Sequence, residues 1–419
     1  MKDVKSKVIE ICNKSKIASY SLSEKKNSER NKALKIIAND ILKNKIKILN
    51  SNNKDYRIAK LNKTPNHLLD RLLLNETRIE NIYSDILNVS KLKDPIGRML
   101  SKHKRPNGLN ITKVSVPLGV IAVIFESRPN VACDVASLCI KSGNSVILKG
   151  GKESKHTTET IISIIKKSLK KANFDPNSVS SLKDYSRTTV NELFKMEKYI
   201  DVLVPRGGKD LIKSVREKSN IPVFSHLDGI CHTYIDNKAK KNMALEVCFN
   251  AKMRRTSICG ATETILCHKD IEKSVLPKLV NKLIHAGCEV RGDKNIIKYN
   301  KNVKKVKNKD WGQEYLDAIV SIKIVKNINE AIEHINTFGS KHTDAIITNS
   351  KKSAELFLNK IESAIVMHNT STQFADGAEF GLGAEIGIST GKLHARGPVS
   401  TQELTTYKYI VKGSGQLRK

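Results

Sequence analysis

The first hundred residues place their hydrophobic side chains at the spacing of amphipathic helices. Leu34, Ile37, Ile41 and Leu42 fall on one helical face. The segment 67–87 repeats the same spacing. The pattern therefore predicts a helical beginning, in which each helix packs one apolar face inward.

Beyond residue 118 the pattern changes to short, continuous apolar runs. The runs at 119–125, 145–151 and 200–208 are typical of strands that are buried on both faces. Between the first two runs, Pro129 suits the first turn of a helix and Gly143 suits its end. The order strand, helix, strand predicts an α/β fold with a doubly wound parallel sheet.

Ligands of doubly wound sheets bind beyond the carboxyl ends of the strands. Two of these ends carry glycine pairs that precede a new helix, Gly150-Gly151 and Gly207-Gly208. Glycine lets the backbone approach a phosphate, and a helix N-terminus attracts anions. The pairs indicate either a dinucleotide site or two ordinary turns, since no G-x-G-x-x-G fingerprint follows a strand.

A hairpin signal interrupts this α/β pattern. Asn107-Gly108 separates two alternating runs within 99–117, which predicts a β-hairpin. Such a hairpin leaves strand edges unpaired. We expect it to pair with the alternating run 403–413 of this chain or of a neighbouring copy.

The composition disfavours several classes of protein, namely nucleic-acid-binding, membrane and metal-binding proteins. The net charge is +32, but aromatic residues make up only 5% and the lysines are spread along the chain. This favours a solvated basic surface over a nucleic-acid-binding protein. Neither a run of 18 apolar residues nor an apolar signal core occurs, so we expect a cytoplasmic protein without membrane contact. The eight cysteines include no C-x-x-C pair, and we expect free thiols and no metal site.

One cysteine is a candidate nucleophile. Cys259 follows the cation pair Arg254-Arg255 within the stretch NAKMRRTSICGATET. Taken alone, this stretch permits two interpretations. Cys259 is either a buried thiol, or a thiolate that nearby positive charge favours.

Several long motifs carry a family resemblance. These are VPLGVIAVIFESRPNVACDVASLCIKSGNSVILKGG, VPRGGKDLI, IPVFSHLDGICHTYID, HINTFGSKHTDAIIT and FGLGAEIGISTGKLHARGPVSTQELTTYKY. Together they resemble the γ-glutamyl phosphate reductases, also called glutamate-5-semialdehyde dehydrogenases, over essentially the whole chain. The resemblance implies the aldehyde dehydrogenase superfamily, with a cofactor domain, a catalytic domain and an oligomerisation arm. It also implies NADPH-dependent reduction of L-glutamyl 5-phosphate in proline biosynthesis.

In this family Cys259 matches the nucleophile that forms a thioester with the substrate. The chain departs from the usual Gln-Arg-Pro before the cysteine and Asn after it, because it has Arg254-Arg255-Thr256 and Gly260. The departure bears on the shape of the loop and on thiol activation. The arginines either lower the thiol pKa or bind anionic groups of the substrate, and Arg128 and Arg255 are candidates for substrate binding.

A second resemblance concerns hydrolysis. Hydrolytic aldehyde dehydrogenases carry Glu-Leu-Gly-Gly where this chain has His226-Leu227-Asp228-Gly229. The resemblance thus implies that the base which activates water is replaced by His226, as suits exchange with phosphate. His226 is a candidate for contact with the substrate or its phosphate, and the alternative is the more common structural role for His226 and His232.

The resemblance also implies cofactor contacts for NADPH or NADP. Lys149 and Glu314 match residues that hold the two riboses, and Ser154 with Lys152 are candidates for the 2′-phosphate. Asn130 either offers its amide to the thioester oxyanion or begins the helix after Pro129. The predicted cofactor-binding residues are Lys149, Gly150, Gly151, Ser154, Gly207, Gly208 and Glu314.

We expect a homo-oligomer, a dimer or larger, with possible functional coupling to glutamate 5-kinase. The active site is expected between the two large domains. The remaining alternatives are a related aldehyde or acylating dehydrogenase with another substrate, and a basic nucleic-acid-binding protein. The predicted parts are the cofactor domain at 1–97 and 118–228, the hairpin at 98–117, the catalytic domain at 229–375, a return at 376–394 and the C-terminal arm at 395–419.

Overall fold

The computed structural model describes residues 2–418 and divides into two compact units. The first unit contains the residues up to 225, together with 381–387 and those from 399 onward. The second contains 226–380 and 388–398. Residues 376–380 and 388–394, which were predicted to return to the cofactor domain, belong to the second unit, where Ile388 packs beside Ala345 and Met367. Residues 226–228, predicted in the cofactor domain, and 395–398, predicted in the arm, also belong to the second unit.

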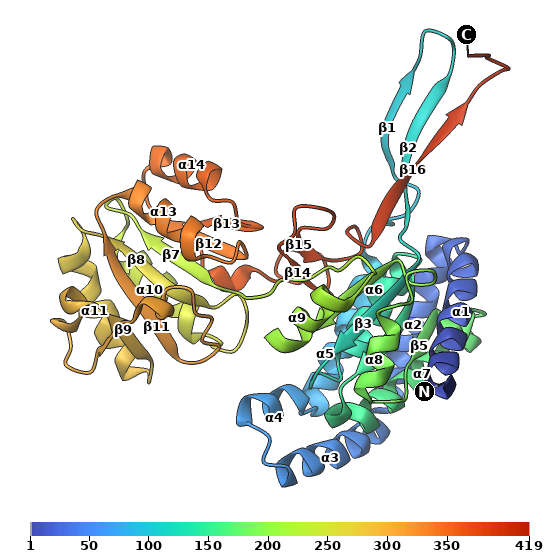
Figure 1. The fold of residues 1–419 in the computed structure, drawn as a ribbon, viewed down its shortest axis with the longest axis horizontal. Helices are drawn as coiled ribbons and strands as arrows, with labels where there is room; N and C mark the ends of the chain where they lie inside the picture. Colours follow the sequence, from blue (N-terminus) through green and yellow to red (C-terminus); the bar gives the residue numbers. More distant parts are fainter. Residues whose placement is uncertain (1, 419) are drawn as a thin grey trace. The chain divides into compact units, whose positions relative to one another are not determined.

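Nine helices of the described residues lie in the first unit, five of them before the first strand (Figure 1). The amphipathic spacing around Leu34 and Ile37 accounts for α2, because both residues are fully buried. The helices are α1 (Lys2–Ser23), α2 (Asn27–Lys43), α3 (Lys45–Leu61), α4 (Asn66–Leu72), α5 (Glu76–Lys91), α6 (Val131–Lys141), α7 (Lys155–Lys171), α8 (Arg187–Leu193) and α9 (Lys209–Lys218).

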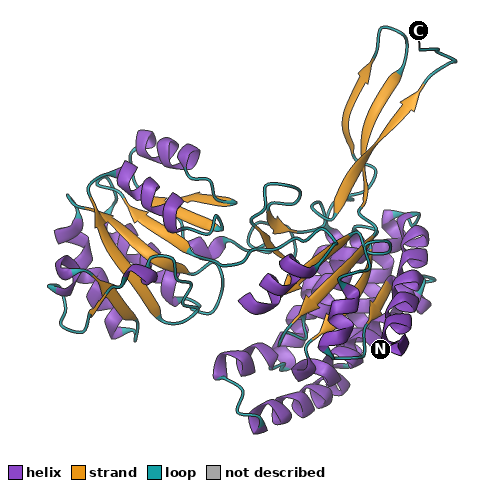
Figure 2. Ribbon diagram, in the orientation of Figure 1, coloured by secondary structure: helices purple, strands orange, loops and turns teal. Residues whose placement is uncertain are grey.

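The first unit is built on a parallel sheet with the order β5-β4-β3-β6. Helices surround this sheet (Figure 2), and every residue of its central strands β3 and β4 is buried. This confirms the strands predicted from the continuous apolar runs. The strands are β3 (Val120–Phe125), β4 (Ser145–Gly150), β5 (Val179–Ser181) and β6 (Val202–Arg206).

The predicted hairpin forms and pairs with the C-terminal run of the same chain. β2 (Asn110–Pro117) lies between β1 (Met99–Lys104) and β16 (Thr405–Lys412), and both neighbours are antiparallel to it. All residues of β1 and all but the first of β16 are exposed. We call these three strands the arm. The prediction that 403–413 extends the hairpin sheet is therefore confirmed within one chain.

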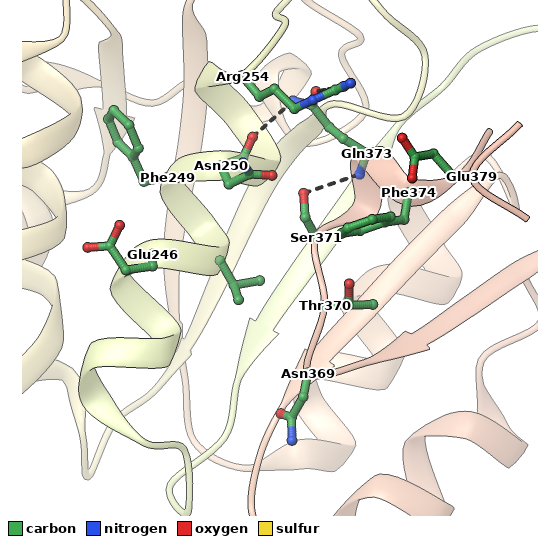
Figure 3. Close-up of a pocket in the computed structure, with 11 residues that line it drawn as sticks. Glu246, Phe249, Asn250, Arg254, Asn369, Thr370, Ser371, Gln373, Phe374 and Glu379 are labelled. Carbon is green, nitrogen blue, oxygen red and sulfur yellow. Dashed lines mark hydrogen bonds between the residues drawn. The ribbon is translucent and has the colours of Figure 1, made fainter.

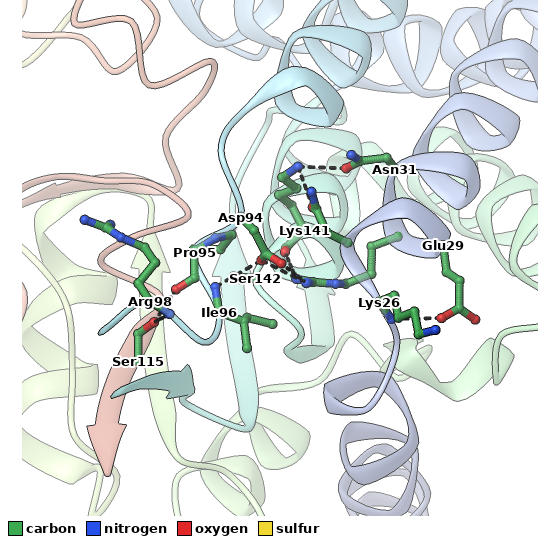
Figure 4. Close-up of polar contacts among 12 residues, drawn as sticks. Lys26, Glu29, Asn31, Asp94, Pro95, Ile96, Arg98, Ser115, Lys141 and Ser142 are labelled. Atoms are coloured by element: carbon green, nitrogen blue, oxygen red, sulfur yellow. Dashed lines mark hydrogen bonds and ion pairs between the residues drawn. The ribbon is translucent and has the colours of Figure 1, made fainter. Parts of the chain in front are cut away.

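A buried polar network fixes the base of the arm to the helices of the first unit (Figure 4). Arg30 of α2 pairs with Asp94 at 2.8 Å, and it donates a further hydrogen bond to the Lys141 carbonyl. The Lys141 ammonium donates to Asn31 at 2.7 Å. The Ser115 hydroxyl of β2 donates to the Pro95 carbonyl at 2.7 Å, next to Asp94. Because Arg30 and Lys141 are fully buried and both hydrogen-bond to other segments, the network fixes the position of the residues from which the arm starts.

The second unit contains a seven-stranded parallel sheet with the order β10-β9-β11-β8-β7-β12-β13. Its strands are β7 (Cys231–Ile235), β8 (Thr262–His268), β9 (Glu289–Gly292), β10 (Lys304–Lys305), β11 (Ile319–Val325), β12 (Thr343–Ile347) and β13 (Ile365–His368). Its helices are α10 (Lys241–Met253), α11 (Glu272–His285), α12 (Lys294–Ile297), α13 (Ile328–Phe338) and α14 (Lys351–Lys360).

Short elements complete the chain. They are the 3₁₀ turns η1 (Lys152–Ser154), η2 (Pro176–Ser178), η3 (Asn308–Asp310) and η4 (Thr372–Phe374) and the paired strands β14 (Gly387–Ser389) and β15 (Gly397–Val399). Within residues 2–418, no helix combines the length and the hydrophobicity needed to span a bilayer.

Candidate active site

Cys259 lies in the loop between α10 and β8 of the second unit. An ion pair closes this loop at its base, because Lys252 of α10 meets Glu263 of β8 at 2.6 Å and both side chains are fully buried. Cys259 therefore precedes the amino end of a central strand, on a loop whose two flanks are tied together.

Two histidines reach Cys259 from the neighbouring strands of the same sheet. His226 precedes β7, and His342 directly precedes β12, the other neighbour of β7. One ligand atom from each of His226, Cys259 and His342 lies within 4.8 Å of the others. We call these three residues the thiol cluster. Since β8, β7 and β12 are adjacent and parallel, their amino ends bring the cluster together.

Hydrogen bonds orient both imidazole rings. The Nδ1 atom of His226 lies 2.6 Å from the Ile388 carbonyl, to which it can only donate. The Nδ1 atom of His342 lies 2.9 Å from the Thr343 hydroxyl. The ring centroids are 4.8 Å apart and the planes meet at 76°. His342 is fully buried, whereas His226 and Cys259 are half-buried and accessible to a substrate.

The thiol cluster changes the chemistry of Cys259. Burial opposes ionisation of the thiol, but the imidazoles of His342 and His226 outweigh it and hold the Cys259 pKa well below its usual range. The other seven cysteines, all within the described residues, have their pKa raised by burial. Cys259 is thus the cysteine that can serve as a thiolate near neutral pH.

The segment before β7 packs directly against the cysteine backbone. A Cβ atom at Gly229 would lie 2.3 Å from the Cys259 carbonyl oxygen and 2.7 Å from its Cα, so only glycine fits there. The Gly229 N–H donates to the Glu314 carboxylate at 2.9 Å, and the Cys231 thiol donates to the Cys259 carbonyl at 3.1 Å. Glu314 is therefore placed beside the cysteine loop, and its contact with a ribose stays a prediction.

A pocket of about 460 Å³ lies beside α10 and η4 (Figure 3). Arg254 lines it and donates to the Gln373 side chain at 3.2 Å. The turn η4, which borders the pocket, packs against the cysteine loop, since a Cβ atom at Gly260 would lie 3.1 Å from the Thr372 carbonyl. Arg254 and Arg255 are exposed, and the leading causes of the lowered Cys259 pKa are histidines rather than arginines. This favours the substrate-binding alternative for the pair.

In the first unit, four predicted cofactor residues gather at the carboxyl end of β4. The Lys149 ammonium donates to the Gly150 carbonyl at 3.1 Å and lies 4.6 Å from the Tyr185 ring centroid. Burial lowers its pKa. Ser154 is buried and begins α7, and its hydroxyl donates to the Gly151 carbonyl at 3.4 Å.

Gly207 and Gly208 lie at the carboxyl end of β6, where Gly208 begins α9. The Gly208 N–H, a predicted contact for a phosphate of the dinucleotide, donates to the Glu126 carboxylate at 2.8 Å. Burial raises the pKa of Glu126. An anionic ligand at this helix start would exchange for the carboxylate of Glu126.

Arg128 and Asn130 belong to the segment between β3 and α6. Asn130 begins α6 but does not cap it with its side chain, because its amide donates to the Asp134 carboxylate at 2.9 Å. The pKa of Asp134 is raised to about 7, because burial outweighs the hydrogen bond from Asn130 and the charge of Arg128, which both lower it. Both residues lie in the first unit and Cys259 in the second, so their roles toward the thioester and the substrate stay predictions.

Comparisons with known proteins identify the family. The model of the aldehyde dehydrogenase family matches residues 5–294. A γ-glutamyl phosphate reductase from Paramagnetospirillum magneticum is 48% identical over 93% of this chain and 92% of that protein. Another from Brucella suis is 45% identical over 100% of this chain and 99% of that protein.

The chain belongs to the γ-glutamyl phosphate reductases of the aldehyde dehydrogenase family.

The crystal structure of γ-glutamyl phosphate reductase from Thermotoga maritima is similar along its whole length. Its TM-score is 0.95 at 39% identity, and the match covers 98% of this chain and 100% of that one. An acetylating aldehyde dehydrogenase from Geobacillus thermoglucosidasius shares the fold, with a TM-score of 0.71 at 17% identity over 100% of this chain and 98% of that one. The predicted family and the predicted aldehyde dehydrogenase-like α/β fold are therefore confirmed. The family uses NAD(P) cofactors.

Sequence reasoning missed His342 and the packing of Gly229 on Cys259. His342 appears within the motif HINTFGSKHTDAIIT, but it was given no role there. A signal was present, because a histidine directly before a buried parallel strand lies at the same edge as the residues before the adjacent strands. The local sequence instead suggested Arg254 and Arg255, which lie close to Cys259 along the chain, as the source of positive charge for the thiolate.

Proposed function

We propose that this γ-glutamyl phosphate reductase converts L-glutamyl 5-phosphate to L-glutamate 5-semialdehyde with NADPH, and releases phosphate, as a step of L-proline biosynthesis. The observation that supports this best is the thiol cluster, in which two imidazoles lower the pKa of Cys259. A thiolate attacks acyl phosphates readily. The relatives named for this activity cover 93% and 100% of the chain.

In the first step the Cys259 sulfur forms a bond to the acyl carbon, and the bond from that carbon to the phosphate oxygen breaks. The leaving phosphate takes the electron pair of that bond and one proton. His226 is suited to supply the proton, because it is half-buried and its Nδ1 is committed to the Ile388 carbonyl, which leaves Nε2 for this transfer. The imidazole is then neutral and no longer paired with a thiolate.

The dinucleotide, when bound, supplies the hydride that reduces the thioester carbon. Lys149, Gly150, Gly151, Ser154, Gly207 and Gly208 fit such a ligand, since they combine a buried cation with glycine-rich helix starts. Lys152 and Ser154 would favour NADPH over NADH by contact with its 2′-phosphate. In the last step the carbon–sulfur bond breaks, Cys259 leaves as a thiolate, and His226 regains a proton from solvent.

The pocket beside η4 is suited to the amino-acid end of the substrate. Arg254 offers a cation for the α-carboxylate, and Glu379 on the same pocket offers an anion for the α-ammonium. The aromatic ring of Phe374 supplies an apolar wall for the methylene chain between them (Figure 3). Opposite charges at two points of one pocket match a zwitterion better than a simple aldehyde.

The decisive experiment runs the reaction backwards. Reduction of NADP by glutamate semialdehyde is measured with phosphate, with coenzyme A and with neither. We expect turnover that requires phosphate and is faster with NADP than with NAD, because His226 replaces the carboxylate that would activate water. Rapid turnover without phosphate would contradict the acyl-phosphate proposal. Turnover with coenzyme A alone would instead favour an acylating dehydrogenase.

The arm supports self-association into a homodimer or a larger oligomer. Its outer strands β1 and β16 have one unpaired edge each, and β16 exposes Tyr407, Tyr409 and Val411. Exposed edges with apolar side chains favour pairing with another copy. Deletion of 403–419 should shift the mass measured by light scattering toward the monomer and reduce activity. A full-length protein that is monomeric and fully active at micromolar concentration would contradict this role.

A further inference from the structure

We propose that the thiol cluster is also a binding site for Zn²⁺ or a similar soft cation, which blocks the nucleophile reversibly. Cys259, His226 and His342 bring one sulfur and two imidazole nitrogens within 4.8 Å of one another. Thiolate and neutral imidazole are preferred zinc ligands. The proposal that a metal binds to the thiol cluster is argued from geometry alone. The proposal that the metal inhibits the enzyme rests on the proposed function.

The spacing of the cluster suits a tetrahedral metal after a small side-chain movement. Zinc lies about 2.3 Å from sulfur and about 2.0–2.1 Å from nitrogen, so its ligand atoms are roughly 3.5 Å apart. Cys259 and His226 are half-buried, which leaves an accessible side for a fourth ligand such as water. Three protein ligands and one open position form a common zinc site.

The ring nitrogens are arranged as in metal sites. In such sites the nitrogen that does not bind the metal donates to a backbone carbonyl or another oxygen. His226 meets this condition through its Nδ1 bond of 2.6 Å to the Ile388 carbonyl. His342 meets it through the Thr343 hydroxyl, 2.9 Å from its Nδ1. The Nε2 atom of His342 is buried and makes no hydrogen bond with any residue of 2–418. Coordination of a metal ion would give its lone pair a partner.

Neighbouring groups do not compete for this role. Cys231 is fully buried and its thiol donates to the Cys259 carbonyl at 3.1 Å, so its proton is already engaged by that carbonyl. Within the described part of the chain, no second set of three such residues comes as close together. The absence of a C-x-x-C pair predicted no metal site, whereas the residues of the thiol cluster lie far apart in sequence, at positions 226, 259 and 342.

Metal binding and acylation exclude each other. A metal on Cys259 uses the sulfur lone pair that attacks the substrate. Conversely, a thioester sulfur is a poor metal ligand, so an acylated enzyme would not bind. Zn²⁺ should therefore compete with the acyl substrate and should leave dinucleotide binding unaffected.

Co²⁺ is the probe that reports this site without any turnover. Titration of the full-length protein should produce a sulfur-to-cobalt charge-transfer band and the visible bands of tetrahedral Co²⁺, and Zn²⁺ should remove both. Cys259→Ser should lose the charge-transfer band, and His342→Gln should weaken binding at least about tenfold. His285→Gln is the matched control, since His285 is exposed on α11 and should leave binding unchanged.

Alkylation of the unmutated protein provides a second test that does not depend on how the variants fold. Iodoacetamide on Cys259 should abolish the cobalt spectrum. An unchanged spectrum after alkylation, or an octahedral spectrum in the untreated protein, would overturn the metal site. If the cobalt spectrum appears but the phosphate-dependent reaction is absent, the site stands and the proposed function fails. If turnover occurs and micromolar Zn²⁺ does not inhibit it, the blocking role is wrong.

Discussion

The candidate groups on the two parallel sheets of the molecule lie at opposite ends of the strands. In the first unit the candidate groups follow the carboxyl ends of β3, β4 and β6 and lead into helices. In the second unit the thiol cluster precedes the amino ends of β7, β8 and β12. The first arrangement presents helix N-termini, which bind anions through backbone N–H groups. The second presents side chains ahead of strands, and therefore it relies on imidazoles to stabilise negative charge.

This difference predicts where each unit is vulnerable. The predicted site in the first unit combines backbone N–H groups with the Lys149 side chain, so fewer of its contacts depend on a single side chain. A site made of three side chains depends on each of them. The largest effects of substitution should therefore arise in the second unit.

The largest effect is expected for Cys259→Ser. Turnover should fall by at least about a thousandfold, because a hydroxyl is a far weaker nucleophile than a thiolate at neutral pH. Binding of NADP, measured by calorimetry, should be nearly unchanged, since all of its predicted contacts except Glu314 lie in the first unit. Cys288→Ser is the control, because Cys288 lies in the core away from the thiol cluster. Substantial activity in the serine variant would rule out a covalent mechanism.

The next effect concerns the base of the cysteine loop. Lys252→Met leaves the Glu263 carboxylate buried without its cation, which should cost about 3–5 kcal/mol of unfolding free energy. Burial already raises the Glu263 pKa to about 7, so the carboxyl should become protonated in the variant. Thermal unfolding of the second unit measures the loss.

The double variant Lys252→Met with Glu263→Leu distinguishes the cause. It removes both charges and should recover much of the stability. A stability equal to that of the single variant would mean that packing around α10, and not an unpaired charge, is responsible.

A smaller effect is expected for thiol activation. His342→Gln or His226→Gln removes an imidazole that lowers the Cys259 pKa, so the pKa should rise toward its usual value. The thiolate fraction at pH 6–7 then falls, and each pKa unit lowers the alkylation rate by about tenfold while the thiol is mostly protonated. Iodoacetamide labelling across pH measures the midpoint, with His285→Gln as the control. Identical midpoints would show that the histidines do not set the thiol pKa.

The smallest effect is expected in the pocket beside η4. Arg254→Gln keeps a hydrogen-bond donor for Gln373 but removes the charge that we assign to the substrate carboxylate. KM for glutamate semialdehyde should rise about tenfold with little change in kcat, the pattern of a group that binds substrate and transition state alike. A fall in kcat at constant KM would place Arg254 in the reaction rather than in recognition.

The same contrast explains what the sequence could predict. Strands β3, β4 and β6 follow from local patterns, because a buried parallel strand is a continuous apolar run. The glycine pairs at the ends of β4 and β6 are likewise visible in the sequence. The arm follows from Asn107-Gly108 and from the alternation of 403–413. Cys259 was identified through resemblance, since its local sequence is equally compatible with a buried thiol.

The rest depends on contacts between distant segments. His342 lies 83 positions after Cys259, and only the strand order β8-β7-β12 shows that the two residues meet. The bond between Glu126 and the Gly208 N–H likewise depends on the adjacency of β3 and β6. Neither contact has a period or a motif, so no local pattern could predict it.

The strand order of the arm also has a consequence for biosynthesis. β2 receives its second neighbour only when β16 has left the ribosome, after the entire second unit has been translated. At about 5–20 residues per second, this interval is on the order of 15 to 60 seconds. During that time the nascent hairpin carries an open edge, which lysines such as Lys102, Lys104 and Lys113 protect against mispairing. The positive charge of these strands thus opposes pairing of the open edge with other chains, and this effect matters most before β16 has been synthesised.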